Sequence, residues 1–217
     1  ASHNPKEYNG YKVYWEDGGQ IVPPIDSRLT EEINGVKYSE IKFKQNKNLI
    51  HTLDSSIEEL YVEKSLSFFN KLYPNSEKNL KIVFTSLHGT SYKLIPTLLK
   101  KTGFLELKLV DKQMTPDGNF THAKSSNPED KLALIDAIEI AKKNNSDLVI
   151  GTDPDADRFG IVVKDFNDDF IQINGNQSMI VLTDFLLSKL EYDKTKSFIA
   201  STVAVSYTHL RAHETVS

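Results

Sequence analysis

Residues 151–158 constrain this chain most, because three aspartates alternate there directly after an apolar run at residues 148–150. In an extended or tightly turned backbone, alternate side chains project the same way, so Asp153, Asp155 and Asp157 converge. Such crowding of negative charge is favourable only around a cation, and an oxygen-only ligand set favours Mg²⁺ or Mn²⁺ over zinc. A magnesium ion with open positions commonly binds phosphate. The loop therefore indicates phosphoryl-transfer chemistry.

Two other interpretations of this loop are weaker. A calcium-binding EF-hand also begins with alternating aspartates, but it needs Gly at its sixth position and Glu at its twelfth. Those positions hold Arg158 and Lys164. A solvated acidic turn without a ligand is the other alternative. The apolar segments 148–150 and 160–163 argue against it, because they predict buried strands that end where open α/β sheets bind ligands.

The first residues of the chain offer a partner for this loop. Ser2 and His3 precede an Asn-Pro pair, which by itself predicts only a turn. Lys12 follows nearby in the sequence. A serine on a turn, a lysine and a metal loop are together the parts needed to hold a phosphate on a side-chain oxygen and neutralise it.

Residues 1–5 and 151–158 together resemble the α-D-phosphohexomutase superfamily, which contains the phosphoglucomutases and phosphomannomutases. The resemblance extends over about residues 1–203. Within the superfamily, the chain is most similar to the branch of bacterial phosphoglucomutases and the phosphoglucomutase-2/phosphopentomutase type. Other segments that resemble the family, in the family's order, are residues 9–24, 87–90, 116–120 and 127–129.

The resemblance implies a metal site with four protein ligands. Ser2 matches the catalytic serine, which the family carries as a phosphoserine, and its phosphate would give one oxygen to Mg²⁺. Asp153, Asp155 and Asp157 match the residues that supply the other oxygens.

The resemblance also implies roles for three charged or polar side chains. Lys12 matches the lysine that orients the phosphate and assists proton transfer, which makes it a catalytic and phosphate-binding residue. Arg158 matches the arginine after the metal loop, and its planar fork suits bidentate contact with a phosphate. His3 either shapes the turn of the nucleophile or takes part directly.

The implied reaction moves phosphate between the 1- and 6-positions of a hexose, with α-D-glucose as the expected sugar. The expected partner is a small sugar phosphate, and glucose 1,6-bisphosphate is the expected intermediate and activator. Mannose and pentose phosphates stay open as alternatives. The protein's task in such a reaction is positioning and charge neutralisation.

The fold implied is α/β, with three-layer αβα domains around mixed sheets, and it is expected to be incomplete. We expect residues 1–47 to form the C-terminal part of a first domain, 48–166 a second domain and 167–205 the beginning of a third. Residues 206–217 break from the family pattern, and we expect them to be a non-native tail. The family has four domains, so the chain is predicted to be a fragment that is inactive alone.

Hydrophobic periodicity supports this organisation. A strand at residues 80–85, a helix at 92–101 closed by Gly103 and a strand at 105–110 predict a βαβ unit. A helix at 130–143, ending at Asn144 and Asn145, leads into the strand before the metal loop. Two more predicted helices are residues 56–72 and 175–190.

Residues 88–90 follow the strand at 80–85, and we expect them to form a strand-to-helix turn rather than a catalytic element. Glycine permits a tight bend there, and Thr90 or Ser91 is expected to cap the following helix.

Composition excludes several classes of protein. The net charge of -4 and the dispersed lysines offer no electrostatic surface for nucleic acid. No run approaches the roughly 18 apolar residues that a membrane span requires. The absence of cysteine excludes disulfides and favours a cytoplasmic enzyme. Composition says nothing of the oligomeric state.

Two rival functions are weaker. A phosphatase of the haloacid dehalogenase type also places Asp-x-Asp after a strand, but it continues to Thr or Val where this chain has Asp157. It also gives Ser2 no role. The non-enzymatic rival is a magnesium-binding module, and it is distinguished by a Ser2 that is never phosphorylated.

Overall fold

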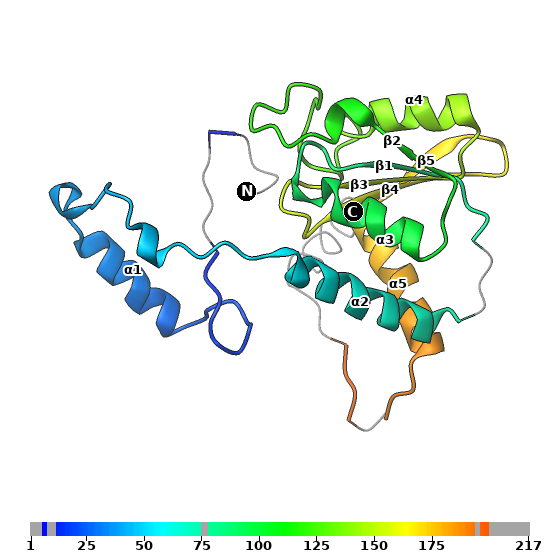
Figure 1. Cartoon of the computed structure of the whole chain (residues 1–217). Coiled ribbons are helices and arrows are strands. Elements are labelled where there is room, and N and C mark those ends of the chain that lie inside the picture. Colours follow the sequence, from blue (N-terminus) through cyan, green and yellow to red (C-terminus); the bar gives the residue numbers. More distant parts are fainter. Residues whose placement is uncertain (1–5, 8–11, 75–77, 194–195, 200–217) are drawn as a thin grey trace, which may run out of the picture.

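The computed structural model describes residues 6–7, 12–74, 78–193 and 196–199 (Figure 1). It contains two parts that are defined here for later use. The sheet unit comprises residues 54–190, and the N-terminal arm comprises residues 12–53. Ser2, His3 and the tail at residues 206–217 lie outside the described residues, as do residues 200–205 of the expected third-domain segment.

A five-stranded mixed sheet organises the sheet unit, in the order β2-β1-β3-β4-β5. The first three strands in this order are parallel, whereas β3, β4 and β5 pair antiparallel. The structure therefore confirms the predicted α/β class with a mixed sheet. The strands are β1 (Ile82–Thr85), β2 (Leu107–Leu109), β3 (Leu148–Thr152), β4 (Phe159–Lys164) and β5 (Phe170–Ile173).

The predicted βαβ unit is present. Helix α3 (Leu94–Lys101) connects β1 to the parallel strand β2, and the chain turns after the helix at Gly103, which has a φ of 103°. Both strands are shorter than the predicted ranges. The predicted helix start at residue 92 was also early, because a 3₁₀ turn, η3 (Thr90–Tyr92), precedes α3.

Helix α4 (Ile135–Asn144) begins five residues after the predicted start. Residues 130–134 form hydrogen-bonded turns instead, in which the Asp130 carboxylate accepts the Leu132 N–H at 2.9 Å. This local bond competes with helix formation, as short polar side chains commonly do. The predicted end is confirmed, because Asn145 terminates the helix in a left-handed conformation with φ of 50°.

Two longer helices match their predicted ranges. Helix α2 (Ser55–Leu72) begins after Asp54, whose carboxylate accepts the Ser56 N–H at 2.9 Å, and α5 (Gly175–Lys189) begins after Asn174 in a capping box. Their ends meet, because the rings of Tyr73 and Phe185 lie 5.4 Å apart. Figure 1 shows α2 and α3 on the side of the sheet opposite to α4. The unit thus has helical layers on both faces of the sheet.

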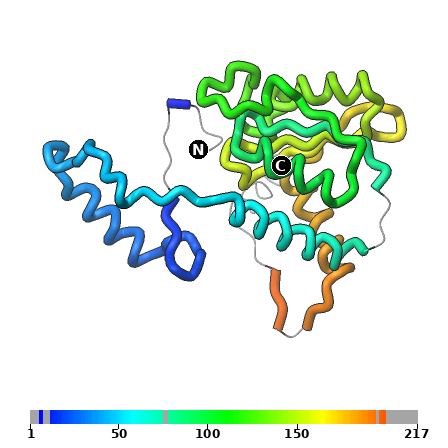
Figure 2. Tube along the Cα trace, viewed as in Figure 1, coloured from blue at the N-terminus to red at the C-terminus, as the bar shows by residue number. Residues whose placement is uncertain are grey.

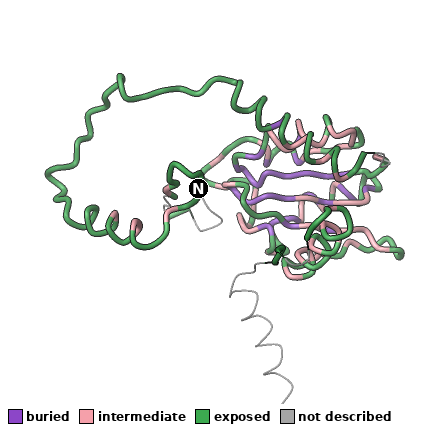
Figure 3. Tube along the Cα trace, turned by 90° about the horizontal axis from the view of Figure 1, so that it is seen from below, coloured by how far each residue is buried: buried purple, intermediate pink, exposed green. Residues whose placement is uncertain are grey.

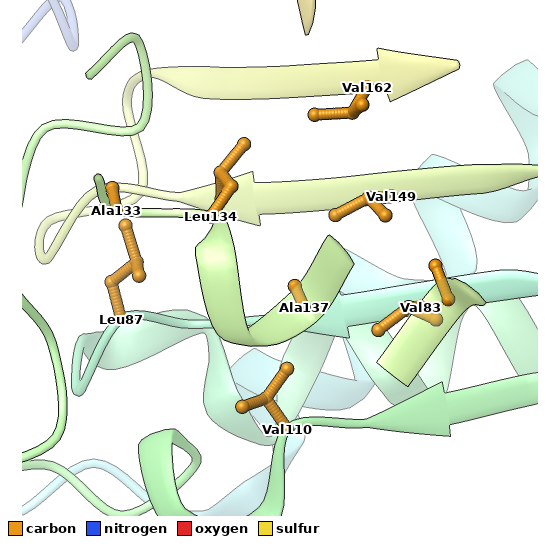
Figure 4. Packing of buried hydrophobic residues seen from close by; sticks show 9 residues of the cluster. Val83, Leu87, Val110, Ala133, Leu134, Ala137, Val149 and Val162 are labelled. Atoms are coloured by element: carbon orange, nitrogen blue, oxygen red, sulfur yellow. The ribbon is translucent and has the colours of Figure 1, made fainter. Parts of the chain in front are cut away.

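The hydrophobic core lies between the sheet and α4 (Figure 4). Leu134 at the start of α4 packs so closely on β3 that a Cβ at Gly151 would lie 2.4 Å from its Cδ2 atom. This glycine therefore allows α4 to approach the strand that carries the metal loop. The fully buried members of the core include Val83, Leu87, Val110, Leu134, Ala137, Ala141, Val149 and Val162.

The N-terminal arm has no comparable core. It contains α1 (Ile25–Gly35), η1 (Tyr38–Glu40) and η2 (Lys47–Leu49), and it extends away from the sheet unit (Figure 2). None of its described residues is buried, whereas the central strands of the sheet unit are buried along most of their length (Figure 3). Within the described part of the chain, no helix combines the length and apolar character needed to cross a membrane.

Candidate metal centre

The aspartate loop connects β3 to β4 as a tight hairpin. The last pair of the ladder is Thr152 with Phe159. Beyond it, the Asp153 N–H donates to the Arg158 carbonyl at 3.2 Å, and the Arg158 N–H donates back to the Asp153 Oδ1 atom at 3.0 Å. Ala156 adopts a left-handed conformation with φ of 63° at the turn. These bonds fix the loop at the end of the most central strand.

The hairpin brings the three aspartates together, as their spacing predicts. Asp153, Asp155 and Asp157 each offer one carboxylate oxygen, and these oxygens all lie within 4.8 Å of one another. Their exposure increases along the loop, because Asp153 is fully buried while the side chains of Asp155 and Asp157 are 17% and 54% exposed.

Two oxygens in this cluster fit a metal ligand set. Among the described residues, the Asp153 Oδ2 and Asp155 Oδ1 atoms are buried without a hydrogen-bond partner. An unpartnered buried carboxylate oxygen is costly, and such atoms call for an unseen ligand. Hard carboxylate oxygens suit Mg²⁺, so the residues present fit the ion.

Crowding and burial also shift the acidity of these groups. Burial raises the pKa of Asp153 to about 6, and the neighbouring Asp155 carboxyl acts in the same direction. The hydrogen bond from the Arg158 N–H acts in the opposite direction, because it stabilises the ionised form. Burial also acts to raise the pKa of Asp155, but the Lys12 ammonium and the interaction with Asp153 outweigh it and hold that pKa below its usual value. The loop is therefore an electrostatically strained site that a cation relieves.

Lys12 supplies a cation to the loop from the N-terminal arm. Its Nζ atom lies 2.8 Å from the Asp155 Oδ2 atom and 2.7 Å from the Asp157 Oδ2 atom. These two hydrogen bonds raise the pKa of Lys12 above its ordinary value, so the Lys12 side chain is a protonated ammonium. The lysine predicted to serve phosphate is thus brought to the aspartate loop across a separation of more than 140 residues.

Arg158 lies at the rim of the centre. Its side chain is 54% exposed, and its Nε atom is 3.9 Å from the Asp157 Oδ1 atom. It also lines a groove of about 650 Å³ that runs from Asp157 along α5. The groove offers space beside the carboxylates for a ligand that Arg158 could reach. Other lining residues include Glu129, Asn176, Ser178 and Thr183.

The turn after β1 packs beneath the aspartate loop, which corrects one prediction. Neither hydroxyl of Thr90 or Ser91 caps the following helix. The Thr90 N–H and Oγ1 atoms instead donate to the Pro154 carbonyl at 2.9 and 3.1 Å, and the Ser91 hydroxyl is hydrogen-bonded to the Thr152 hydroxyl. A Cβ at Gly89 would lie 2.5 Å from the Pro154 Cα atom. The turn therefore supports the metal loop.

His88 in this turn has both ring nitrogens engaged. Nδ1 lies 2.7 Å from the Thr115 carbonyl, which accepts a hydrogen bond from it, and Nε2 accepts from the His122 N–H at 3.1 Å. Its backbone carbonyl accepts the Asp117 N–H at 3.2 Å. His88 thus ties the turn to residues 115–122, and the turn connects β1 to the following helical segment as predicted.

The sequence interpretation missed Gln113, a buried polar side chain that joins separate segments. Gln113 is 1% exposed. Its Oε1 atom accepts from the Thr85 hydroxyl at 2.7 Å, and its Nε2 atom donates to the His122 carbonyl at 2.7 Å and to Asp136 at 3.2 Å. No local pattern distinguishes such a glutamine, because its side-chain partners come from three separate segments.

Comparison with known proteins identifies the family. A model described as the phosphoglucomutase/phosphomannomutase alpha/beta/alpha domain II matches residues 59–167, which is half of the chain. The chain belongs to the phosphoglucomutase/phosphomannomutase family. The model of the family's alpha/beta/alpha domain I matches residues 1–40. The resemblance of the sequence motifs to this family is therefore confirmed.

Individual relatives agree with this assignment. Phosphoglucomutases from two strains of Staphylococcus aureus are 39% identical to the chain over 212 residues, which is 96% of this chain and 38% of theirs. The chain thus spans well under half the length of these relatives.

Two solved structures of the family share the fold. A Thermus thermophilus protein with a provisional phosphomannomutase assignment superposes with a TM-score of 0.66 at 22% identity, covering 87% of this chain and 40% of that one. A phosphoglucomutase/phosphomannomutase family protein from Burkholderia thailandensis gives a TM-score of 0.56 at 21% identity, covering 86% and 36%.

Proposed function

We propose that this chain is the phosphoserine- and metal-binding part of a phosphosugar mutase that interconverts hexose 1-phosphate and hexose 6-phosphate, with α-D-glucose as the sugar. Membership of the phosphoglucomutase/phosphomannomutase family supports the reaction class. The name of the Staphylococcus aureus relatives supports glucose. The observation that carries the proposal is the aspartate cluster, with two buried and unpartnered oxygens at the end of β3.

The proposal assigns the metal ligands to Asp153, Asp155 and Asp157 together with a phosphate oxygen on Ser2. Magnesium, when bound, would neutralise charge on the phosphoryl group during transfer. The Arg158 N–H holds the Asp153 Oδ1 atom, which leaves the Asp153 Oδ2 atom for the ion. The turn at residues 89–91 keeps the loop in place from below through its two bonds to the Pro154 carbonyl.

The transfer is proposed to begin from phosphorylated Ser2. The free hydroxyl oxygen of the sugar monophosphate forms a bond to phosphorus as the bond from phosphorus to the Ser2 Oγ atom breaks, and the hydroxyl proton passes to the released serine oxygen. The product is a sugar bisphosphate. After it turns over in the site, the other phosphate returns to Ser2 by the same exchange, so the net change is isomerisation with no phosphate consumed.

Lys12 and Arg158 serve as cations in this proposal. Lys12 carries a positive charge, because its two carboxylate partners hold its pKa above the ordinary range. While these carboxylates hold it, Lys12 is therefore a cation and not a base, and it is proposed to stabilise anionic phosphate oxygens once it leaves them. Arg158, at the rim of the groove, offers a planar fork for a second phosphate. A cytoplasmic location is part of the same proposal and agrees with a chain that contains no cysteine.

A coupled mutase assay on the corresponding full-length polypeptide tests this function. The assay supplies Mg²⁺, glucose 1,6-bisphosphate as primer, and glucose 1-phosphate, mannose 1-phosphate or ribose 1-phosphate. We expect the fastest turnover with glucose 1-phosphate and its loss in Ser2→Ala. Faster turnover of the mannose or ribose compound would replace the sugar in the proposal, and turnover that survives Ser2→Ala would contradict the phosphoserine mechanism.

A further inference from the structure

Lys12 shares two carboxylates with the proposed metal ion. Its ammonium contacts two of the three aspartates, at 2.8 Å from Asp155 and 2.7 Å from Asp157. The lysine belongs to the N-terminal arm, whereas both carboxylates belong to the hairpin between β3 and β4. This pair of contacts therefore joins two parts of the chain at the metal loop.

The six carboxylate oxygens of the cluster differ in their partners. The Asp153 Oδ1 atom is bonded to the Arg158 N–H, and the Asp153 Oδ2 and Asp155 Oδ1 atoms are buried and unpartnered among the described residues. The Asp155 Oδ2 and Asp157 Oδ2 atoms are bonded to Lys12. The sixth oxygen, Asp157 Oδ1, lies 3.9 Å from the Arg158 Nε atom. An ion held by all three aspartates therefore takes its Asp157 ligand either from this oxygen, with the ammonium on the same carboxylate, or from the Oδ2 atom in place of the ammonium.

We propose that Lys12 is a built-in competitor of the metal ion, which bridges Asp155 and Asp157 without the ion and withdraws from them when the ion binds. The inference rests on the proposed metal-binding function. In this proposal Lys12 has two successive positions. Its ammonium first contacts the two carboxylates and, once released from them, is free to turn toward a phosphate. The Lys12 side chain is 42% exposed, so it has solvent space into which to move.

The competition has a simple electrostatic basis. An ammonium is a single point charge on a flexible stem, and it relieves only part of the repulsion among three carboxylates. A divalent ion carries twice the charge and is repelled by a nearby ammonium. Removal of the Lys12 charge should therefore tighten metal binding, although the same change would remove a cation that the phosphate needs.

Lys6 provides a matched control in the same stretch of chain. Its Nζ atom lies 3.5 Å from the Asn119 side-chain oxygen. In the part of the chain that the structure describes, the ion pairs of Asp155 and Asp157 are with Lys12 and Arg158 and not with Lys6. Lys6→Met removes the same charge as Lys12→Met without removing a contact to Asp155 or Asp157. A difference between the two variants thus isolates the proposed contact from the change in net charge.

The experiment is a titration of the full-length polypeptide with Mn²⁺, followed by electron paramagnetic resonance of the free ion. We expect Lys12→Met and Lys12→Gln to bind Mn²⁺ about three- to tenfold more tightly than wild type, and Lys6→Met to stay within about twofold, since exposed charges are screened. Equal or weaker binding by both Lys12 variants would overturn the competition while leaving the metal site intact. Wild-type binding that Asp153→Asn does not weaken would instead overturn the metal site, and the inference with it.

Discussion

The sheet unit and the N-terminal arm differ in the burial of their apolar side chains. In the sheet unit, Val83, Leu134 and Val149 are fully buried between the sheet and α4. In the arm, Tyr38 and Phe43 are 79% and 76% exposed, and no described residue is buried. The sheet unit thus contains its own hydrophobic driving force, whereas the arm has helices without a core beneath them.

The candidate site combines residues from both regions. Its carboxylates follow β3, the central and largely buried strand of the sheet, while Lys12 comes from the arm. Rigid elements hold ligands accurately, and a cation on a loosely packed segment can exchange partners. The difference between the two regions therefore suits a site in which the aspartates stay fixed and Lys12 moves.

The largest expected effect concerns packing and compares one substitution in each region. Leu134→Ala removes a fully buried side chain that packs against Gly151 below the metal loop, and we expect a loss of about 2–5 kcal/mol in the free energy of unfolding. Phe43→Ala, in the arm, should change it by less than about 0.5 kcal/mol. Urea denaturation of both variants measures the two values. Similar losses would show that the arm has a core after all.

The second prediction compares one glycine substitution in each region. The added methyl group in Gly89→Ala would lie 2.5 Å from the Pro154 Cα atom, so the backbone of the metal loop must shift, at a cost of about 1–3 kcal/mol. We expect several-fold weaker Mn²⁺ binding as well. Gly35→Ala in the arm meets no atom within 4 Å and lies in α1, so it should be neutral or stabilising by up to about 1 kcal/mol. Unchanged metal affinity in Gly89→Ala would show that the turn does not support the loop.

The smallest expected effect is a pH dependence within the sheet unit. Hydrogen bonds from the Thr121 hydroxyl and from the Asn119 and Thr121 N–H groups lower the pKa of Asp117 to about 2 from its ordinary 3.8. Because the folded pKa lies below the unfolded one, the ionised carboxylate stabilises the fold above about pH 4, and this contribution disappears as the pH falls toward about 2.

Urea unfolding of Asp117→Asn checks this dependence. The variant should be less stable than wild type at pH 7, and the difference should shrink below about pH 4. Thr121→Val, which removes the hydroxyl donor, should show a weaker form of the same pattern. A difference between wild type and Asp117→Asn that is the same at pH 7 and pH 3 would contradict the assignment.

Local sequence predicted those features that depend on neighbouring residues. The aspartate cluster follows from alternate spacing between two apolar strands, and α2 and α5 follow from their apolar periodicity and the residues that begin them. The predicted start of α4 was wrong because the Asp130 side chain stabilises a local turn, which competes with the helix. Periodicity alone does not weigh such alternatives.

The remaining features depend on contacts between distant segments. Thr90 and Ser91 were expected to cap a helix, but the Pro154 carbonyl and the Thr152 hydroxyl compete for their hydroxyl groups. Gln113 joins segments that only the folded sheet brings together. The contact of Lys12 with the aspartates is equally non-local, and the family resemblance predicted a phosphate for it rather than these carboxylates. Tertiary structure alone reveals such partners.

The central claim is that Asp153, Asp155 and Asp157 hold a divalent ion, and anomalous diffraction tests it most directly. Crystals of the full-length polypeptide grown with Mn²⁺ would be measured at the manganese absorption edge. We predict one strong anomalous peak in contact with an oxygen of each aspartate, with Lys12 withdrawn from Asp157. Absence of a peak at the loop, with Lys12 still bridging Asp155 and Asp157, would contradict the account.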